Sequence, residues 1–248
     1  MGSVWGDFDN DGREDVLVYR YGYLALFKNL DGHHFQDITQ AVGLRRWVNS
    51  NGAIWVDYDR DGLLDLYVTA YFRDDVDLWH LSTTRIMHNS FEFATNGGKN
   101  LMFHNRGDGT FEDVTDRLGV GSTRWTLAAA AADMNEDGWP DIYLANDYGP
   151  EELYINDHGK RFTLQTPGLE SESKSGMAVA SAIPSHGVSV HQTYRPALST
   201  AQNRVIAGTT RAIVTKSRRS KAGLRSLGGR GRARSAARAA SAKASSIR

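Results

Sequence analysis

The sequence predicts an all-β fold, a partial β-propeller of about three four-stranded blades followed by a largely disordered basic tail. Three observations support this. An acidic loop of one pattern occurs three times, an element that begins with Asn follows each loop, and short β-rich runs flank both. Repeated units with four short strands each are typical of propeller blades. A β-sandwich is the rival fold, but a sandwich does not require its units to resemble one another.

The spacing of the repeats defines the units. The acidic loops lie 50 and 76 residues apart and begin at Asp7, Asp57 and Asp133. The second elements lie 76 and 51 residues apart and begin at Asn29, Asn105 and Asn156. The unit is therefore about 50 residues long. One unit carries an insertion of about 26 residues, which we place at about 71–100.

Each unit contains short β-rich runs bounded by Asn, Asp and Gly, the pattern expected of strands. In the second unit these runs are AIWV (53–56), DLYVTA (65–70), LMFHN (101–105) and TFEDVT (110–115). Large aromatic residues recur in such runs, and we expect them to lie in the core: Trp5, Trp55, Tyr67 and Tyr143.

The acidic loops are predicted to bind Ca²⁺. Carboxylates packed this closely repel one another unless a cation lies among them. Ca²⁺ takes six to eight oxygen ligands, which alternate residues of a tight loop can supply, and the glycine at the sixth position allows the sharp turn. The predicted ligands are Asp7, Asp9, Asp11, Asp15 and the carbonyl of Arg13; Asp57, Asp59, Asp61, Asp65 and the carbonyl of Leu63; and Asp133, Asn135, Asp137, Asp141 and the carbonyl of Trp139.

Three alternatives fit these loops less well than a calcium site inside a β-hairpin: a metal-free turn, an EF-hand and a magnesium site. Asp, Asn and Gly also form turns without a metal, but three copies in register favour a metal site. An EF-hand loop would end in Glu at its twelfth position, where this chain has Val18, Val68 and Leu144. Mg²⁺ is less suitable because it keeps several waters. The third loop should bind calcium more weakly, since Asn135 replaces a carboxylate.

The pattern D-x-D-x-D-G-x-x-D between two strands, followed by LFKNLDGHHFQDIT or MFHNRGDGTFEDVT, resembles the FG-GAP/VCBS repeat. The chain looks like the propeller part of bacterial proteins similar to cartilage acidic protein, in which an ASPIC/UnbV domain follows. The resemblance covers about residues 2–177. It implies a seven-bladed propeller with Ca²⁺ in hairpin loops and a role in extracellular or surface binding and adhesion. This chain departs from that pattern, because it has about three blades and no ASPIC/UnbV domain.

Charge divides the chain in two, although its net charge is zero. Residues 173–248 hold 15 of the 29 Lys and Arg and no Asp or Glu, so residues 1–172 carry 14 − 29 = −15. We therefore expect repeats over 1–177 and a basic low-complexity tail over 178–248. A frameshift near 178–181 is the favoured origin of the tail. Nucleic-acid binding through its phosphate-neutralising charge is the alternative, and the lack of stacking aromatics after Tyr194 argues against it.

Several other classes of function find no support in the sequence. The chain has no cysteine, no apolar run of about 18 residues and no N-terminal secretory signal. It lacks the common hydrolase and nucleotide motifs, and its histidines show no zinc pattern. We therefore expect a binding protein and no enzyme, with a hydrolase on a propeller scaffold as the competing class. The expected partner is a protein or a glycan. Docking of this partner on the insertion is one hypothesis, and plain packing of the insertion on the repeats is the favoured one.

Overall fold

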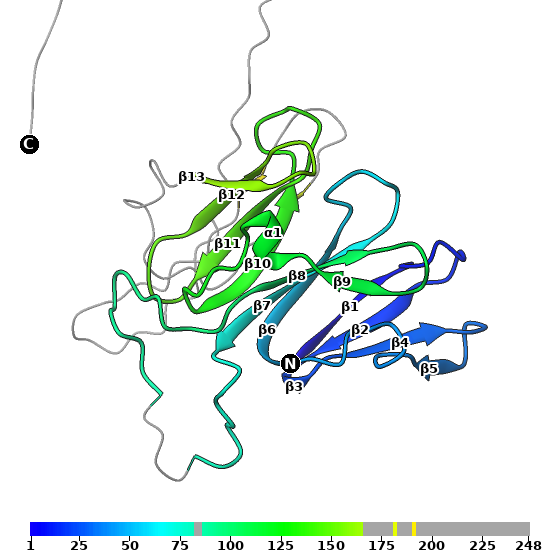
Figure 1. Ribbon diagram of the computed structural model, residues 1–248, viewed down its shortest axis with the longest axis horizontal. Helices are drawn as coiled ribbons and strands as arrows, with labels where there is room; N and C mark the ends of the chain where they lie inside the picture. Colours follow the sequence, from blue (N-terminus) through cyan, green and yellow to red (C-terminus); the bar gives the residue numbers. More distant parts are fainter. Residues whose placement is uncertain (82–85, 166–180, 183–189, 192–248) are drawn as a thin grey trace, which may run out of the picture. The chain divides into compact units, whose positions relative to one another are not determined.

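The computed structural model describes residues 1–81, 86–165, 181–182 and 190–191. Up to residue 165 its regular structure is almost entirely antiparallel strand, arranged in three sheets (Figure 1). After residue 165 two strands of two residues each, β14 (Ser181–Ala182) and β15 (Val190–His191), pair with each other. The expectation of a disordered basic tail otherwise lies outside the described residues.

Each sheet corresponds to one predicted blade. The first contains β1 (Gly2–Gly6), β2 (Asp15–Tyr19), β4 (Ala25–Asn29) and β5 (Phe35–Asp37). The second contains β3 (Tyr21–Tyr23), β6 (Trp47–Val56), β7 (Asp65–Phe72), β8 (Leu101–Asn105) and β9 (Phe111–Asp113). The third contains β10 (Thr126–Ala132), β11 (Asp141–Asn146), β12 (Glu152–Asn156) and β13 (Phe162–Gln165).

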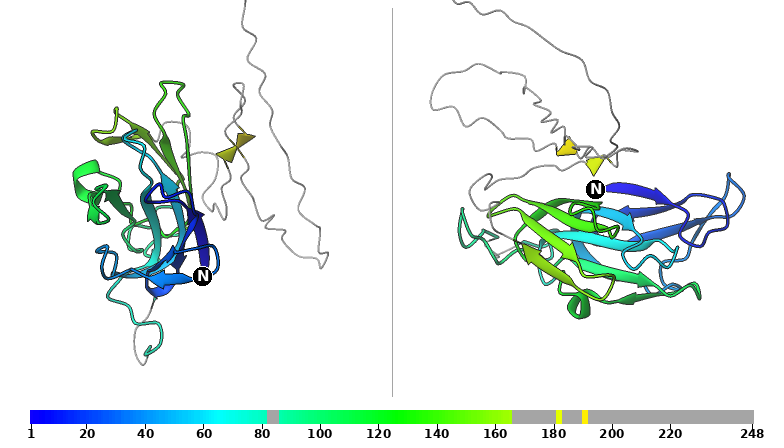
Figure 2. Two further views of the ribbon diagram at one scale, coloured as in Figure 1. Left: turned by 90° about the vertical axis from the view of Figure 1, so that its right-hand side faces the viewer. Right: turned by 90° about the horizontal axis from the view of Figure 1, so that it is seen from above.

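The three sheets follow one another in chain order (Figure 2). β6, the first of the four repeated strands of its blade, packs against the corresponding strands β1 and β10 of the other two. Each acidic loop joins the first two repeated strands of its blade, so all three loops occupy the same place in the repeat. These findings confirm the predicted all-β fold with three propeller-like blades.

The hydrophobic core lies between the sheets. One cluster joins the first blade to the second, and another joins the second blade to the third. Strand β7 contributes side chains to both clusters, since successive residues of a strand point to opposite faces. Leu66 and Val68 belong to the first cluster, whereas Tyr67 belongs to the second, and all three are fully buried.

Three details differ from the sequence-based expectations, and one, the irregular structure of the insertion, was not predicted in either direction. The second blade has a fifth strand, because the ten-residue β6 is long enough to pair with β3 as well as β7. A short helix, α1 (Thr115–Leu118), connects the second and third blades and ends at Gly119 in the left-handed region. The described part of the insertion after β7 contains no helix or strand. The prediction that Trp5 lies in the core is wrong, since it is 55% exposed.

Candidate metal centre

The three acidic loops adopt one backbone structure. The first aspartate of each loop accepts hydrogen bonds from the backbone amides of the fifth and sixth residues. For Asp7 the donors are Asp11 at 2.9 Å and Gly12 at 2.8 Å, and Asp57 and Asp133 make the corresponding bonds at 2.8–3.1 Å. The glycines at the sixth position have φ of +84°, +88° and +91° at Gly12, Gly62 and Gly138. This left-handed conformation explains why glycine recurs there.

The ninth-position aspartates connect each loop to its own sheet. All three are fully buried, and each accepts two backbone hydrogen bonds. Asp65 accepts from the amide of Asn105 at 2.8 Å and from that of Tyr58 at 3.2 Å. Asp15 and Asp141 make the corresponding pairs of bonds. These aspartates therefore connect the loop and the strand that follows it to the next repeated strand of the blade, which is β4, β8 or β12.

The structure brings three of the four predicted acids of each of the first two loops close together, leaving out Asp11, while Asp65 groups with Asp59 and His104. Ligand oxygens within 4.8 Å of one another come from Asp7, Asp9 and Asp15 in the first loop and from Asp57, Asp59 and Asp61 in the second. Oδ1 of Asp9 and Oδ1 of Asp59 are buried and accept no hydrogen bond from the described residues. A buried carboxylate oxygen without a partner is unfavourable unless a cation or a donor compensates for it. The donor set therefore fits a hard cation such as Ca²⁺.

The third loop is arranged differently. Asn135 and Asp137 bond to each other, through Nδ2 to Oδ2 at 2.8 Å and from the Asp137 amide to the Asn135 side-chain oxygen at 3.0 Å. The first-position and ninth-position residues, Asp133 and Asp141, hold their places as in the other loops. Among the described acids and histidines, no group of three ligand atoms within 4.8 Å lies in this loop.

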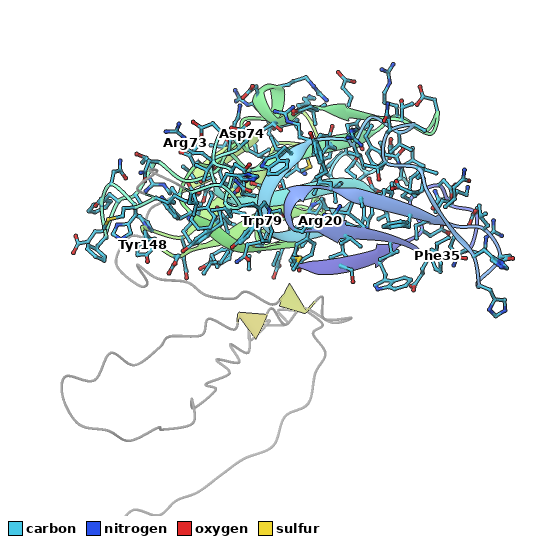
Figure 3. All side chains as sticks on the ribbon, turned by 90° about the horizontal axis from the view of Figure 1, so that it is seen from below. Arg20, Phe35, Arg73, Asp74, Trp79 and Tyr148 are labelled. Atoms are coloured by element: carbon cyan, nitrogen blue, oxygen red, sulfur yellow. The ribbon has the colours of Figure 1, made fainter. Side chains whose placement is uncertain are left out.

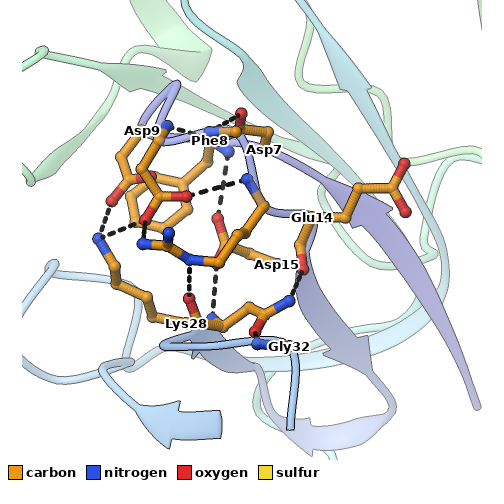
Figure 4. A network of polar contacts seen from close by, with 11 residues as sticks. Asp7, Phe8, Asp9, Glu14, Asp15, Lys28 and Gly32 are labelled. Atoms are coloured by element: carbon orange, nitrogen blue, oxygen red, sulfur yellow. Dashed lines mark hydrogen bonds and ion pairs between the residues drawn. The ribbon is translucent and has the colours of Figure 1, made fainter. Parts of the chain in front are cut away.

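One residue beside each loop was missed from the sequence. It precedes the repeated Asn, and it is Lys28, His104 or Ile155 in the three blades. Lys28 forms ion pairs with Asp9 and, at 3.3 Å, with Asp11 (Figure 4). Nδ1 of His104 lies 3.0 Å from Oδ1 of Asp65 and 3.6 Å from Oδ2 of Asp59. Alignment of the second elements would have revealed the position.

Burial and neighbouring acids affect the ionisation of these groups. Burial, which disfavours the charged form, raises the pKa of Asp65 to about 7, with a further contribution from the charge of Asp59. It also raises the pKa of Asp15, Asp59 and Asp141. A cation among these carboxylates would favour their ionised forms.

The repeated asparagines connect neighbouring blades. Nδ2 of Asn105 donates to the carbonyl of Phe8 in the first loop at 2.7 Å and to that of Leu64 in its own hairpin at 3.2 Å. Nδ2 of Asn156 bonds in the same way to Tyr58 at 2.8 Å and to Pro140 at 3.0 Å. The first and second loops are thus held both from their own blade and from the blade that follows.

The family comparison agrees with this repeat. A model described as an FG-GAP-like repeat matches residues 7–68 and 93–144. The first matched segment contains the first two acidic loops, and the second matched segment contains the third. The recognition of FG-GAP-like repeats from the sequence is therefore confirmed.

Curated relatives match over a short region. Cartilage acidic protein 1 from Homo sapiens is 46% identical over 66 residues, and the proteins of that name from Mus musculus and Xenopus tropicalis are 42% and 41% identical. The alignment covers 25% of this chain and 10% of each relative. Among solved structures, an Agrocybe aegerita lectin that recognises non-reducing terminal N-acetylglucosamine aligns with a TM-score of 0.31 and 15% identity, over 78% of this chain and 60% of the lectin.

Proposed function

We propose, from the match of residues 7–68 and 93–144 to a model of an FG-GAP-like repeat, that this chain is a calcium-binding module that acts in extracellular or surface binding and adhesion. The proposal rests above all on the carboxylates that gather in the first two loops around an unpartnered oxygen of Asp9 and of Asp59. The third loop is proposed as a weaker site, because Asn135 and Asp137 are already hydrogen-bonded to each other.

The residues proposed to hold Ca²⁺ are those at positions one, three, five and nine of each loop, with the carbonyl of position seven. Bound Ca²⁺ would supply positive charge that offsets the repulsion among the carboxylates. The chain itself positions these groups. In the first loop, Asp7 accepts the hydrogen bonds that fix the turn, and the buried Asp15 connects the loop to β4. Hairpins that are marginal alone would be stabilised in this way.

Replacing Lys28 with Ile, the residue that the third blade has at this position, should strengthen calcium binding at the first loop. The Lys28 ammonium pairs with Asp9 and Asp11, two of the proposed ligands, and therefore competes with the ion. Removing one nearby positive charge should improve affinity by about tenfold, equivalent to about 1.4 kcal/mol. Calorimetric titration with CaCl₂ measures this effect.

The matched control is Lys28→Arg, which keeps the charge and should leave the affinity of the first loop near that of the original chain. Unchanged affinity in Lys28→Ile would contradict the assignment of Asp9 and Asp11 as ligands. The second loop provides an internal reference in the same titration.

The insertion is the proposed docking surface for a protein or glycan partner. It presents large exposed aromatic side chains, Trp79 at 71% and Phe91 at 72% exposure. His88 stacks on Tyr148 of the third blade with ring centroids 3.9 Å apart, so the insertion also packs on the repeats. Deletion of residues 73–98 is expected to abolish binding to a panel of immobilised glycans and matrix proteins while Ca²⁺ binding persists. Equal binding by the deletion variant would reject this surface.

The remaining assignments are also proposals. Extracellular or surface location rests on the resemblance to FG-GAP/VCBS proteins; no helix among the described residues is long and apolar enough to cross a membrane. Repeats over 1–177 with a separate tail over 178–248 remain the proposed domain division. A binding role is preferred to catalysis, and a hydrolase screen of the purified chain tests the competing class. The alternative of nucleic-acid binding concerns the tail, which lies mostly outside the described residues.

A further inference from the structure

The first and second acidic loops are joined by hydrogen bonds that involve their proposed ligands. The amide of Phe8 donates to Asp15 at 3.3 Å, and the carbonyl of Phe8 accepts the side-chain amide of Asn105 at 2.7 Å. The backbone amide of the same Asn105 donates to Asp65, the ninth-position ligand of the second loop, at 2.8 Å. One residue, Asn105, therefore holds groups of both loops.

The second and third loops are joined in the same way. The amide of Tyr58 donates to Asp65 at 3.2 Å, and its carbonyl accepts the side-chain amide of Asn156 at 2.8 Å. The backbone amide of Asn156 donates to Asp141 at 2.8 Å. Because Asp15, Asp65 and Asp141 are all fully buried, water cannot readily replace their hydrogen bonds. The arrangement recurs between blades and is therefore a property of the repeat.

The carbonyls that accept these side-chain bonds lie next to further proposed ligands. Phe8 and Tyr58 precede Asp9 and Asp59, whose Oδ1 atoms are buried and accept no hydrogen bond from the described residues. A peptide group is planar, so a bond to its carbonyl also restrains the residue that follows. Asn105 thus restrains the third-position ligand of one loop and holds the ninth-position ligand of the next.

The fourth residue of a loop also contacts the following loop. Nδ2 of Asn10 donates to the carbonyl of Gly62 at 2.9 Å, and the guanidinium of Arg60 lies over the ring of Trp139, 5.4 Å from its centroid. Asn10 and Arg60 share a left-handed backbone conformation, with φ of +56° and +60°. Each lies between the third-position and fifth-position ligands of its own loop. Neighbouring loops are therefore in contact at two places.

We propose that the first and second loops bind Ca²⁺ with positive cooperativity, an inference that rests on the proposed function because it concerns the regulation of the same sites. An ion that orders Asp9 also orders the neighbouring carbonyl that Asn105 binds. Asn105 in turn holds Asp65 in place for the second ion. The second loop then loses less conformational entropy when it binds its ion. Linkage requires the effect to be reciprocal, so an ion in the second loop strengthens binding in the first.

Repulsion between the two ions acts in the opposite direction. It is screened by salt, since the Debye length is about 8 Å at physiological ionic strength and about 3 Å at 1 M. Coupling through shared hydrogen bonds and coupling through charge therefore differ in sign and in salt dependence. Positive cooperativity should persist in about 1 M NaCl, where the repulsion is largely screened.

Calorimetric titration of the full chain with CaCl₂ in about 1 M NaCl measures the coupling. Every chain carries Asp137→Asn, so that only the first two loops bind. Asp59→Asn then leaves the first loop as the binding site, and Asp9→Asn leaves the second. The product of the two affinities in the chain with both loops intact should exceed the product of the two single-loop affinities by about fivefold or more. The salt also screens the charge that each substitution removes.

Asn105→Ala should abolish this excess, because it removes the side-chain bond to Phe8. If that variant does not fold, as judged by circular dichroism, Asn10→Gly removes the contact with Gly62, keeps the left-handed conformation and should reduce the excess. Asn29→Ala is the matched control. Among the described residues, the Asn29 side-chain amide donates only within its own hairpin, at Glu14, so the excess should remain.

Phe91→Ala provides a control distant from the loops. Phe91 belongs to the insertion and lies 6.0 Å from Tyr148 between ring centroids. Figure 3 shows Tyr148 at the opposite end of the view from Phe35, which pairs with Asn29 beside the first loop. This variant should keep the full excess.

The possible outcomes separate the coupling from calcium binding itself. Two ions whose affinities show no excess, or a deficit, would overturn the cooperativity and leave the proposed calcium binding intact. The absence of any heat would overturn both. An excess that persists unchanged in folded Asn105→Ala and Asn10→Gly would overturn the assigned route, because the coupling would then not depend on these contacts.

Discussion

Replacing Asp65 with Ala is expected to lower the free energy of unfolding by about 2–5 kcal/mol. The Asp65 carboxylate is fully buried and accepts the backbone amides of Asn105 and Tyr58. Alanine would leave both amides buried without an acceptor, and each such group costs about 1–3 kcal/mol. The nearby His104 would also lose the nearer of its two acidic partners. Urea unfolding followed by tryptophan fluorescence measures the change, with calcium chelated so that metal binding does not contribute.

The control is Asp61→Ala in the same loop. Asp61 is exposed and accepts the amide of Leu63 at 2.8 Å, so its removal should cost less than about 1 kcal/mol in the absence of metal. If Asp65→Ala does not fold, Asp65→Asn keeps one acceptor oxygen and should be intermediate. Similar stability of the Asp61 and Asp65 variants would contradict the structural role of the ninth-position aspartates.

Replacing Asn105 with Ala should be the second large effect, a loss of about 2–3 kcal/mol. Its side-chain amide reaches two hairpins of neighbouring blades, at the carbonyls of Phe8 and Leu64, and its oxygen accepts the amide of Gly107 at 3.1 Å. Asn105 is almost fully buried, so the groups it leaves behind cannot readily bond to water. Thermal unfolding should show a lower Tm and a broader transition, since the contact between the first two blades is weakened.

Asn29→Ala is the matched control for this variant. Asn29 has the same place in the repeat, but its amide reaches only one hairpin among the described residues, at Glu14. The cost should therefore be about 1 kcal/mol smaller than that of Asn105→Ala. Equal losses in the two variants would show that the bond between blades adds little stability.

The sequence predicted the parts of the fold that repeat. Three loops with Asp and Gly in register, and the Asn-led elements behind them, were enough to place the hairpins and blades, because turn geometry and strand alternation are local properties. The prediction failed where burial depends on neighbours. Trp5 and Trp55 occupy the same position in successive blades, yet Trp55 packs into the core between blades and Trp5 is largely exposed. No local pattern distinguishes the two.

In the candidate site, too, the local features were predicted from the sequence and the contacts between distant residues were not. The sequence identified the carboxylates of the first two loops, and the structure brings ligand oxygens of three of them in each loop within 4.8 Å of one another. It did not reveal that Asp65 and its counterparts are occupied by backbone amides, since the Asn105 amide that bonds to Asp65 lies on a strand 40 residues away. It also missed Lys28 and His104. An alignment of the second elements would have marked their position, but their contacts with Asp9 and Asp65 are made between strands and are seen only in the folded chain.

The central claim, that the acidic loops bind calcium, is tested most directly by calorimetric titration of the chelator-treated chain with CaCl₂. We expect measurable heat with saturation at two or three ions per chain, the third being weaker. Calcium at about 100 times the dissociation constant should then stabilise the fold by about 2.7 kcal/mol for each site and raise Tm. The double variant Asp9→Asn, Asp59→Asn should lose most of this response. No heat and no rise in Tm for the unmodified chain would contradict the account.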